Sequence, residues 1–255
     1  MTFYGMTDIG RKRENNEDNF EIFKVADNAT LLLVCDGMGG EAGGAEASAL
    51  AIESFISELR EQTSGKTVGG KLVLDDPEVD VPMILDNAVY NDNFEVWQKS
   101  QDVPELHGMG TTLVGAFIMT EPLCVWSVNV GDSRMYLMDE EKIGQMTVDH
   151  SYVQHLVDTG VITPAEAEKR TDKNIITRAI GISVQAEPDI KPIGASEGDI
   201  VLLCSDGLSG MLTADEIHGV AARQGVSAEE KSRKLISLAN DAGGDDNITV
   251  VIAEL

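Results

Sequence analysis

The sequence has few cysteines for its length, and none of them is placed for cross-linking. Among 255 residues there are three, Cys35, Cys124 and Cys204, each in or at the end of an apolar stretch. An odd number without short spacings excludes a disulfide framework and a Cys-x-x-Cys metal site. We therefore expect three buried thiols in a reducing compartment, which predicts a cytoplasmic protein.

Basic residues and long apolar runs are also scarce. The chain has 19 Lys and Arg against 44 Asp and Glu, a formal net charge of −25. Because phosphate backbones are bound by clustered Lys and Arg, this balance argues against nucleic-acid or anionic-membrane binding. No apolar stretch approaches the roughly 20 residues of a membrane span. Residues 1–19 contain no apolar segment of the kind found in signal peptides.

The remaining composition is that of a soluble globular protein. Hydrophobic residues make up 42% of the chain and charged residues 25%, which is an ordinary mixture. The length is compatible with one large or two small domains. No shift in composition marks a linker, so we predict a single domain over residues 1–255.

Short β-type runs come in clusters, with amphipathic helical stretches between the clusters. Nine strands are predicted, at 2–10, 19–25, 30–35, 111–119, 123–130, 133–138, 187–193, 200–205 and 248–253. Four helices are predicted, at 45–60, 81–100, 213–223 and 227–242. Because strands and helices do not alternate strictly, the pattern favours an α+β fold with antiparallel sheets.

Two segments lie outside this pattern. Residues 61–80 are polar and Gly-rich, and we expect an exposed connection there. Residues 149–174 contain two short helical pieces, at 151–158 and 164–170, without a strong apolar face. We predict that this second segment forms a mobile flap at about 149–174.

Aspartates recur at the edges of the predicted strands. Two apolar runs each end in Asp-Gly, and three further acidic sites stand at strand edges; the residues are Asp18, Asp36, Asp132, Asp206 and Asp246. A single Asp in a turn usually caps its own backbone. Five at strand edges, with almost no Lys beside them, indicate oxygen ligands for a hard cation such as Mg²⁺ or Mn²⁺.

Competing motifs are weaker. Gly37, Gly39 and Ala42 fit a permissive dinucleotide fingerprint, but Asp36 would then point a carboxylate at the pyrophosphate. No cysteine has an Arg six positions after it, so a nucleophilic thiol of the tyrosine-phosphatase kind is excluded. The four histidines show no zinc-binding spacing.

A longer set of motifs occurs in order along the chain. It comprises Thr7-Asp8-x-Gly10-x-x-Arg13-x-x-Asn16-Glu17-Asp18, Asp36-Gly37-Met38-Gly39-Gly40, Gly110-Thr111-Thr112, Gly131-Asp132-Ser133-Arg134, Asp149-His150-Ser151, Thr177-Arg178-Ala179-Ile180-Gly181, Ser205-Asp206-Gly207-Leu208 and Asp246-Asn247-Ile248-Thr249. Over about residues 2 to 254 the chain resembles the metal-dependent protein phosphatase family of type 2C, in its short bacterial form. The resemblance implies an αββα fold of four layers, in which two antiparallel sheets pack as a sandwich with helices on both outer faces.

The resemblance also implies an activity and a set of site residues. The activity is hydrolysis of phosphoserine and phosphothreonine on proteins, in opposition to bacterial kinases, with two tightly bound Mn²⁺ or Mg²⁺ ions and a third, weaker one. Two such ions lower the pKa of a shared water. The implied metal ligands are Asp36 as the bridge, the Gly37 carbonyl, Asp206, Asp246, Asp18 through water, and Asp132 for the third ion. Arg13 matches the catalytic, phosphate-binding arginine, whose planar fork suits a phosphate.

One departure from the family pattern concerns the leaving-group acid. Animal members have a His after the first Asp-Gly, whereas this chain has Met38, which cannot donate a proton. A metal-bound water and His150 remain as alternatives. We expect Arg134 to form a structural ion pair.

The alternative function belongs to another class, a non-catalytic regulatory or sensing module of the same fold. Such relatives usually lack one or more of the metal carboxylates, whereas all five are present here. For the enzyme we expect phosphorylated proteins as partners, including a serine/threonine kinase, and neither nucleic acid nor membrane. We also expect a monomer.

Overall fold

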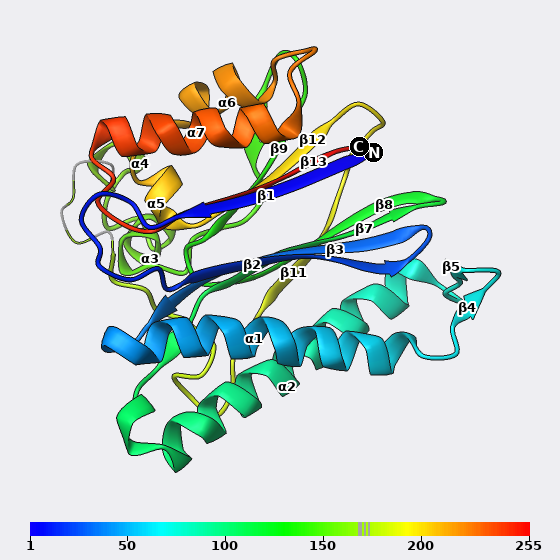
Figure 1. The fold of residues 1–255 in the computed structure, drawn as a ribbon, viewed down its shortest axis with the longest axis horizontal. Coiled ribbons are helices and arrows are strands. Elements are labelled where there is room, and N and C mark those ends of the chain that lie inside the picture. The colour runs from blue at the N-terminus through cyan, green and yellow to red at the C-terminus, as the bar shows by residue number, and fades with distance from the viewer. Residues whose placement is uncertain (168–169, 171, 173) are drawn as a thin grey trace.

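Two antiparallel β-sheets lie face to face at the centre of the molecule (Figure 1). The computed structural model describes residues 1–167, 170, 172 and 174–255. The first sheet has the order β1 (Thr2–Asp8), β13 (Ile248–Glu254), β12 (Ile200–Cys204), β9 (Arg134–Met138), β10 (Ile143–Gln145). The second has the order β11 (Asp189–Ile193), β8 (Leu123–Val130), β7 (Leu113–Thr120), β3 (Ala29–Met38), β2 (Asp18–Ala26), with β6 (Gly110–Thr111) beside β3.

Helices cover the outer face of each sheet (Figure 1). The long helices α1 (Gly40–Thr63) and α2 (Pro77–Asp102) lie on the second sheet, and α5 (Asp206–Ser209), α6 (Ala214–Ala221) and α7 (Ala228–Ala242) lie on the first. The shorter elements are β4 (Thr67–Val68), β5 (Lys71–Leu72), η1 (Pro104–Leu106), α3 (Tyr152–Asp158) and α4 (Pro164–Ala167). The predicted sandwich with helices on both faces is therefore confirmed.

The alternation of side chains along each central strand builds three separate apolar cores. In β3, Leu31 and Leu33 pack toward α1 and α2, while Leu32 packs between the sheets. In β13, Val250 packs toward the helices of the first sheet, and Val251 packs between the sheets. A strand buried on both faces reads as a continuous apolar run, which is how these strands appear in the sequence.

All nine predicted strands are present, with boundaries shifted by a few residues. One expectation about them is wrong: the strand that carries Asp36 does not end there, because β3 continues to Met38 and pairs with β6. The predicted connection at 61–80 is shortened from both sides by α1 and α2, with β4 and β5 in the remaining part. Cys35 and Cys204 are buried as expected, whereas Cys124 is only half-buried.

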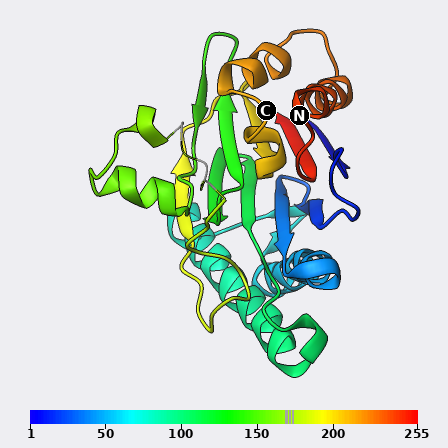
Figure 2. The same ribbon diagram turned by 90° about the vertical axis from the view of Figure 1, so that its left-hand side faces the viewer.

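The helices α3 and α4 stand to one side of the sheets, in yellow-green in Figure 2. They correspond to the two helical pieces predicted in the flap segment. The predicted range of the second piece, 164–170, includes residues 168 and 169, and the flap range also includes 171 and 173; these four positions lie outside the described residues. None of the helices in the described ranges combines the length and apolarity that a membrane crossing requires.

Candidate active site

A cleft of about 440 Å³ lies at one end of the sandwich, and both sheets contribute to it. Six of the seven predicted site residues line it: Arg13, Asp36, Gly37, Asp132, Asp206 and Asp246. The seventh, Asp18, is 4% exposed and stands directly opposite Asp36 in the pairing of β2 with β3. The fold thus brings together carboxylates from widely separated parts of the sequence.

Two threonines fix the backbone of Asp36. Its N–H donates to the Thr112 hydroxyl at 3.0 Å. Its carbonyl accepts from the Thr112 N–H at 2.9 Å and from the Thr111 hydroxyl at 2.9 Å. The Gly-Thr-Thr motif of the sequence therefore holds the central carboxylate in a defined position on the wall of the cleft.

Close packing requires a glycine at the second position of each Asp-Gly pair. A Cβ on Gly37 would come within 2.1 Å of the Gly44 carbonyl oxygen, and one on Gly207 within 1.9 Å of the Asn247 carbonyl oxygen. Because both obstacles are backbone atoms, they cannot move aside cheaply. The glycines thus let neighbouring segments approach the aspartates closely, and neither of the two has a positive φ.

Asp18 is held beneath the cleft by two buried hydroxyls. Ser205 and Thr249 each donate to its Oδ2 at 2.7 Å, while its Oδ1 is buried without a partner. Burial raises the pKa of Asp18 to about 7, with a further increase from the charges of Asp206 and Asp246, although the two hydroxyls act in the opposite direction.

The other carboxylates of the cluster disfavour one another's charge. Burial raises the pKa of Asp36 well above its ordinary value, and the neighbouring carboxylates raise it further. Burial also raises the pKa of Asp132 to about 7, with Asp206 and Asp149 adding to the effect. Burial and then the charge of Asp246 raise the pKa of Asp206. Such a cluster needs a positive counter-charge to ionise fully.

Arg13 supplies one positive charge at the rim of the cleft. Its Nη2 donates to Asp246 Oδ2 at 2.6 Å, and this bond raises the pKa of the guanidinium. The loop that carries Arg13 is fastened by Asn247, whose Nδ2 donates to the carbonyls of Ile9 and Asn15 at 3.0 and 2.9 Å. The Asp-Asn pair before β13 therefore positions both the acid and its basic partner.

Comparison with known proteins shows the family to which this chain is similar. A model of the family described as protein phosphatase 2C matches residues 9–240. The chain belongs to this family. A serine/threonine phosphatase of Listeria monocytogenes, Stp, is 36% identical over 248 residues, which cover 97% of this chain and 93% of the relative.

Solved structures of family members have the same fold. The serine/threonine phosphatase of S. agalactiae superposes with a TM-score of 0.86 at 31% identity, over 98% of each chain. The catalytic domain of the phosphatase PstP, in complex with two manganese ions, superposes with a TM-score of 0.80 at 35% identity, over 99% of this chain and 97% of that one.

The donor set of the cleft fits the divalent cations that the 2C family implies. As the side chains stand, no three His, Cys, Asp or Glu within the described residues form a group ready to hold a metal ion. However, Oδ1 of Asp18 and Oδ1 of Asp206 are buried without a partner. Two unpartnered carboxylate oxygens inside an acidic cluster, all of them hard donors, match the ligand preference of Mg²⁺ and Mn²⁺.

Several supporting residues lie in the quoted motifs, but sequence reasoning gave them no role. Glu17 lines the cleft, and burial raises its pKa. Ser205 and Thr249 hold Asp18, and Thr112 fixes Asp36. Thr249 carries a signal in hindsight, because it is a single fully buried polar residue in the apolar run of β13.

The predicted ion pair of Arg134 is confirmed. Its Nε and Nη2 donate to the two oxygens of Asp149 at 2.9 and 2.6 Å. His150, one of the two alternatives for the leaving-group acid, is 7% exposed and is not among the residues that line the cleft. Met38 does line it.

Proposed function

We propose that this chain, a serine/threonine protein phosphatase by its family and its relatives, uses divalent cations bound by the aspartate cluster to dephosphorylate phosphoserine and phosphothreonine. The observation that carries the proposal is the convergence of aspartates from both sheets on one cleft, with Arg13 as a cation at the rim. A site of this kind attracts phosphate only after its negative charge has been neutralised.

The proposed ligands follow from the arrangement of the cleft. Asp36, with its backbone fixed on three sides, suits a carboxylate that bridges two ions, and the Gly37 carbonyl is the next donor along β3. Asp206 and Asp246 approach from the first sheet, and Asp18 acts from below through water. When bound, two divalent ions lower the pKa of a shared water and neutralise charge on the phosphate. The ions bound by the PstP catalytic domain were manganese, and we propose Mn²⁺ or Mg²⁺ here.

Arg13 acts as the phosphate-binding residue in this proposal. In the structure, its guanidinium is paired with Asp246, and about half of its side-chain surface is exposed, 52%. Once the Asp246 carboxylate has another positive partner, the guanidinium is released to form a forked pair of hydrogen bonds with a phosphate dianion. The same side chain thus shields the cluster before substrate binds and orients the phosphate afterwards.

Asp132 serves a third, weaker cation together with Asp206. Both residues line the cleft, and burial, followed by the charge of Asp206, raises the pKa of Asp132. A hard cation held by one or two carboxylates keeps most of its waters and binds weakly.

His150 is not the leaving-group acid in this proposal. Its ring is buried and its Nδ1 accepts a hydrogen bond from the backbone of Gly131 at 3.1 Å. A water in the cleft therefore protonates the departing serine or threonine oxygen.

The setting of the enzyme is proposed as well. We propose a cytoplasmic, monomeric, single-domain signalling enzyme that acts on phosphorylated proteins, a serine/threonine kinase among them. We also propose that the flap segment at about 149–174 governs the choice of protein substrate, because Asn174 at its end lines the cleft. No observation favours the non-catalytic alternative.

The central test replaces the bridging carboxylate. Asp36→Asn should lower turnover of p-nitrophenyl phosphate by about 10³-fold or more, because the proposed pair of ions loses its shared ligand. Activity of the unaltered chain should require added Mn²⁺ or Mg²⁺ and vanish in EDTA. The control is Asp245→Asn, which removes an exposed carboxylate that is paired with Lys12. Full turnover by a metal-free preparation would overturn the proposal.

A second test separates the carboxylates by role. Asp132→Ala should leave two ions tightly bound but reduce phosphopeptide turnover, whereas Asp246→Ala should empty one of the tight sites. Calorimetric Mn²⁺ titration of both variants, beside phosphopeptide kinetics, measures the difference. Loss of tight binding in Asp132→Ala, or two filled tight sites in Asp246→Ala, would refute this division.

A further inference from the structure

The Asp149-His150-Ser151 segment is firmly attached to the body of the protein. Asp149 is bound by Arg134 of β9. The Ser151 hydroxyl accepts from the Gln154 N–H at 3.1 Å and so caps α3. The carbonyl of His150 accepts from the Thr177 N–H at 2.7 Å. The imidazole of His150 is therefore held on a fixed backbone.

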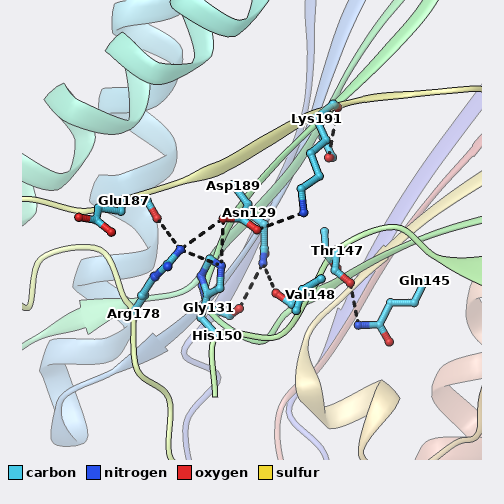
Figure 3. Close-up of polar contacts among 11 residues, drawn as sticks. Asn129, Gly131, Gln145, Thr147, Val148, His150, Arg178, Glu187, Asp189 and Lys191 are labelled. Atoms are coloured by element: carbon cyan, nitrogen blue, oxygen red, sulfur yellow. Dashed lines mark hydrogen bonds and ion pairs between the residues drawn. The ribbon is translucent and has the colours of Figure 1, made fainter. Parts of the chain in front are cut away.

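The His150 ring contacts the turn between β8 and β9 (Figure 3). The ring Nδ1 accepts from the Gly131 N–H at 3.1 Å, and the backbone N–H of His150 donates to the Gly131 carbonyl at 2.9 Å. Asn129 adds a second donor, from Nδ2 to the same carbonyl at 3.2 Å. Both polar backbone groups of Gly131 are thus bound, and His150 contributes to each.

The backbone conformation of the turn that His150 contacts is tightly restricted. Gly131 has φ +117, and a Cβ there would meet the side chain of Thr112 at 2.6 Å. On the far side of Asp132, the Ser133 and Thr112 hydroxyls are 2.8 Å apart. Asp132 therefore stands between two anchored neighbours, and the anchor on the Gly131 side includes the His150 ring.

The opposite side of the His150 ring faces Arg178 and Asp189, which come from two other segments of the chain (Figure 3). Because Nδ1 accepts a hydrogen bond, the proton of the neutral ring is on Nε2. Nε2 lies 3.3 Å from Arg178 Nη1 and 3.6 Å from Asp189 Oδ1. Nη1 of Arg178 donates to that Asp189 oxygen and to the Glu187 carbonyl, both at 3.3 Å. Lys191 donates to the other oxygen of Asp189 at 3.2 Å. Arg178 and Asp189 thus flank Nε2, while the Gly131 N–H is the donor to Nδ1 on the other side of the ring.

We propose that His150 is a positioning residue that keeps Asp132 in place for its cation by accepting the Gly131 N–H at Nδ1. This inference rests on the proposed role of Asp132 in holding a weak third ion. It gives the geometry of the turn a specific cause, namely one acceptor atom behind the carboxylate, and it assigns His150 no contact with substrate.

Two conservative variants separate this role from simple packing. In His150→Asn the side-chain oxygen can occupy the position of Nδ1 and accept the Gly131 N–H. In His150→Gln the polar end lies one bond further out, near the position of Nε2, so the Gly131 N–H loses its acceptor. Both variants remove the aromatic ring, which makes each the control for the other.

Amide hydrogen exchange of the metal-free proteins tests the positioning itself. His150→Gln should exchange the 131–133 segment about tenfold faster than the unaltered chain, and His150→Asn should stay within about threefold of it. Equal exchange in both variants would overturn the proposal. Unfolding of both would do so as well, because His150→Asn retains the acceptor.

Calorimetric titration with Mn²⁺ tests the consequence for the cation. His150→Gln should weaken the last, weak binding step about tenfold and leave the two tight steps unchanged, and His150→Asn should restore the weak step. If the weak binding step disappears in Asp132→Ala but is normal in His150→Gln, the proposed role of His150 is refuted and that of Asp132 stands. A weak step that persists in Asp132→Ala refutes the proposed role of Asp132, while the exchange result still decides whether His150 holds the turn.

Discussion

Asp92 is a buried carboxyl group with few hydrogen-bond partners. It lies on α2, fully buried at 0% exposure, and Ser54 of α1 donates to its Oδ1 at 3.0 Å. Its Oδ2 is buried without a partner. Burial raises the pKa of Asp92 well above its ordinary value, although the bond from Ser54 acts in the opposite direction. The group lies outside the cleft, so its effect is on stability.

The first prediction at this scale is that Asp92→Asn stabilises the protein at neutral pH. Because the pKa is raised in the folded state, the stability that Asp92 contributes is complete below the unfolded pKa of about 4 and is lost as pH rises through the folded pKa. An amide has no charge to desolvate and still accepts from Ser54. The free energy of unfolding at pH 7, from urea titration, should rise by about 1–3 kcal/mol, and the gain should disappear near pH 4.

The control for this prediction is Asp86→Asn, which changes the same residue type at an exposed position of the same helix. It should alter the unfolding free energy by less than about 0.5 kcal/mol at either pH. A gain in Asp92→Asn that is the same at pH 4 and pH 7 would contradict the explanation by charge burial.

Among the elements, α4 and α6 begin with the same capping arrangement in different parts of the fold, and α7 has a similar one at Ser227. Before α4, Glu166 Oε2 accepts from the Thr163 N–H and hydroxyl, both at 2.8 Å. Before α6, Glu216 Oε2 accepts in the same way from Thr213 at 2.9 Å. The α4 box belongs to the flap segment, whereas α6 covers the outer face of the first sheet. The two glutamates are therefore a matched pair.

The prediction at this scale concerns the flap. Glu166→Ala removes the cap of α4 and should change kcat/KM for a phosphopeptide by at least about fivefold, while p-nitrophenyl phosphate turnover changes by less than about twofold. The reason is that lids govern the fit of large substrates more than bond chemistry. Glu216→Ala, which removes an equivalent cap away from the flap, should affect both substrates alike. Equal effects of Glu166→Ala on both substrates would contradict the flap proposal.

The elements also show what sequence patterns could predict. Strands such as β3 and β13 carry strong apolar runs, which predict their positions to within a few residues. The three-residue β10 and the four-residue α5 are too short to show a period. The Asp-Gly pairs were interpreted as strand ends, yet Asp36 continues in β3 and Asp206 opens α5, because the same dipeptide suits any place where backbones approach closely.

For the candidate site, the residue types can be predicted from the sequence, but the contacts between those residues cannot. Aspartates at strand edges indicate oxygen ligands for a hard cation, but only the fold shows that Asp18 stands opposite Asp36. The hydroxyls of Ser205 and Thr249 that hold Asp18 come from residues about 190 to 230 positions away. Such contacts depend on how two sheets are stacked, which local patterns do not encode.

At the scale of the whole molecule, the aspartate cluster contains residues from both sheets. Asp18 and Asp36 belong to the second sheet, while Asp206 and Asp246 are attached to strands of the first. In a chain of net charge −25, their mutual repulsion opposes the stacking of the sheets. Cations that bind between them would therefore hold the two halves of the sandwich together.

The prediction at this scale is that Mn²⁺ stabilises both sheets together. At a hundredfold excess over Kd, one bound ion adds about 2.7 kcal/mol to the free energy of unfolding. The melting temperature should rise with Mn²⁺ and fall again with EDTA. Amide exchange should slow in β3 and in β12 alike, and slowing confined to one sheet would contradict a shared site. In Asp36→Asn most of the increase should be absent.

The pairing of β1 with β13 has a consequence for the time at which the enzyme is completed. β1 aligns along its whole length with Ile248–Glu254, so it has no partner strand in its sheet until those residues have been synthesised. Asp246 lies two residues before β13 and emerges from the ribosome at the same stage. Pairings across such a sequence separation form slowly. On the proposed role of Asp246, a nascent chain acquires a complete phosphatase site only after β13 has been synthesised and has paired with β1.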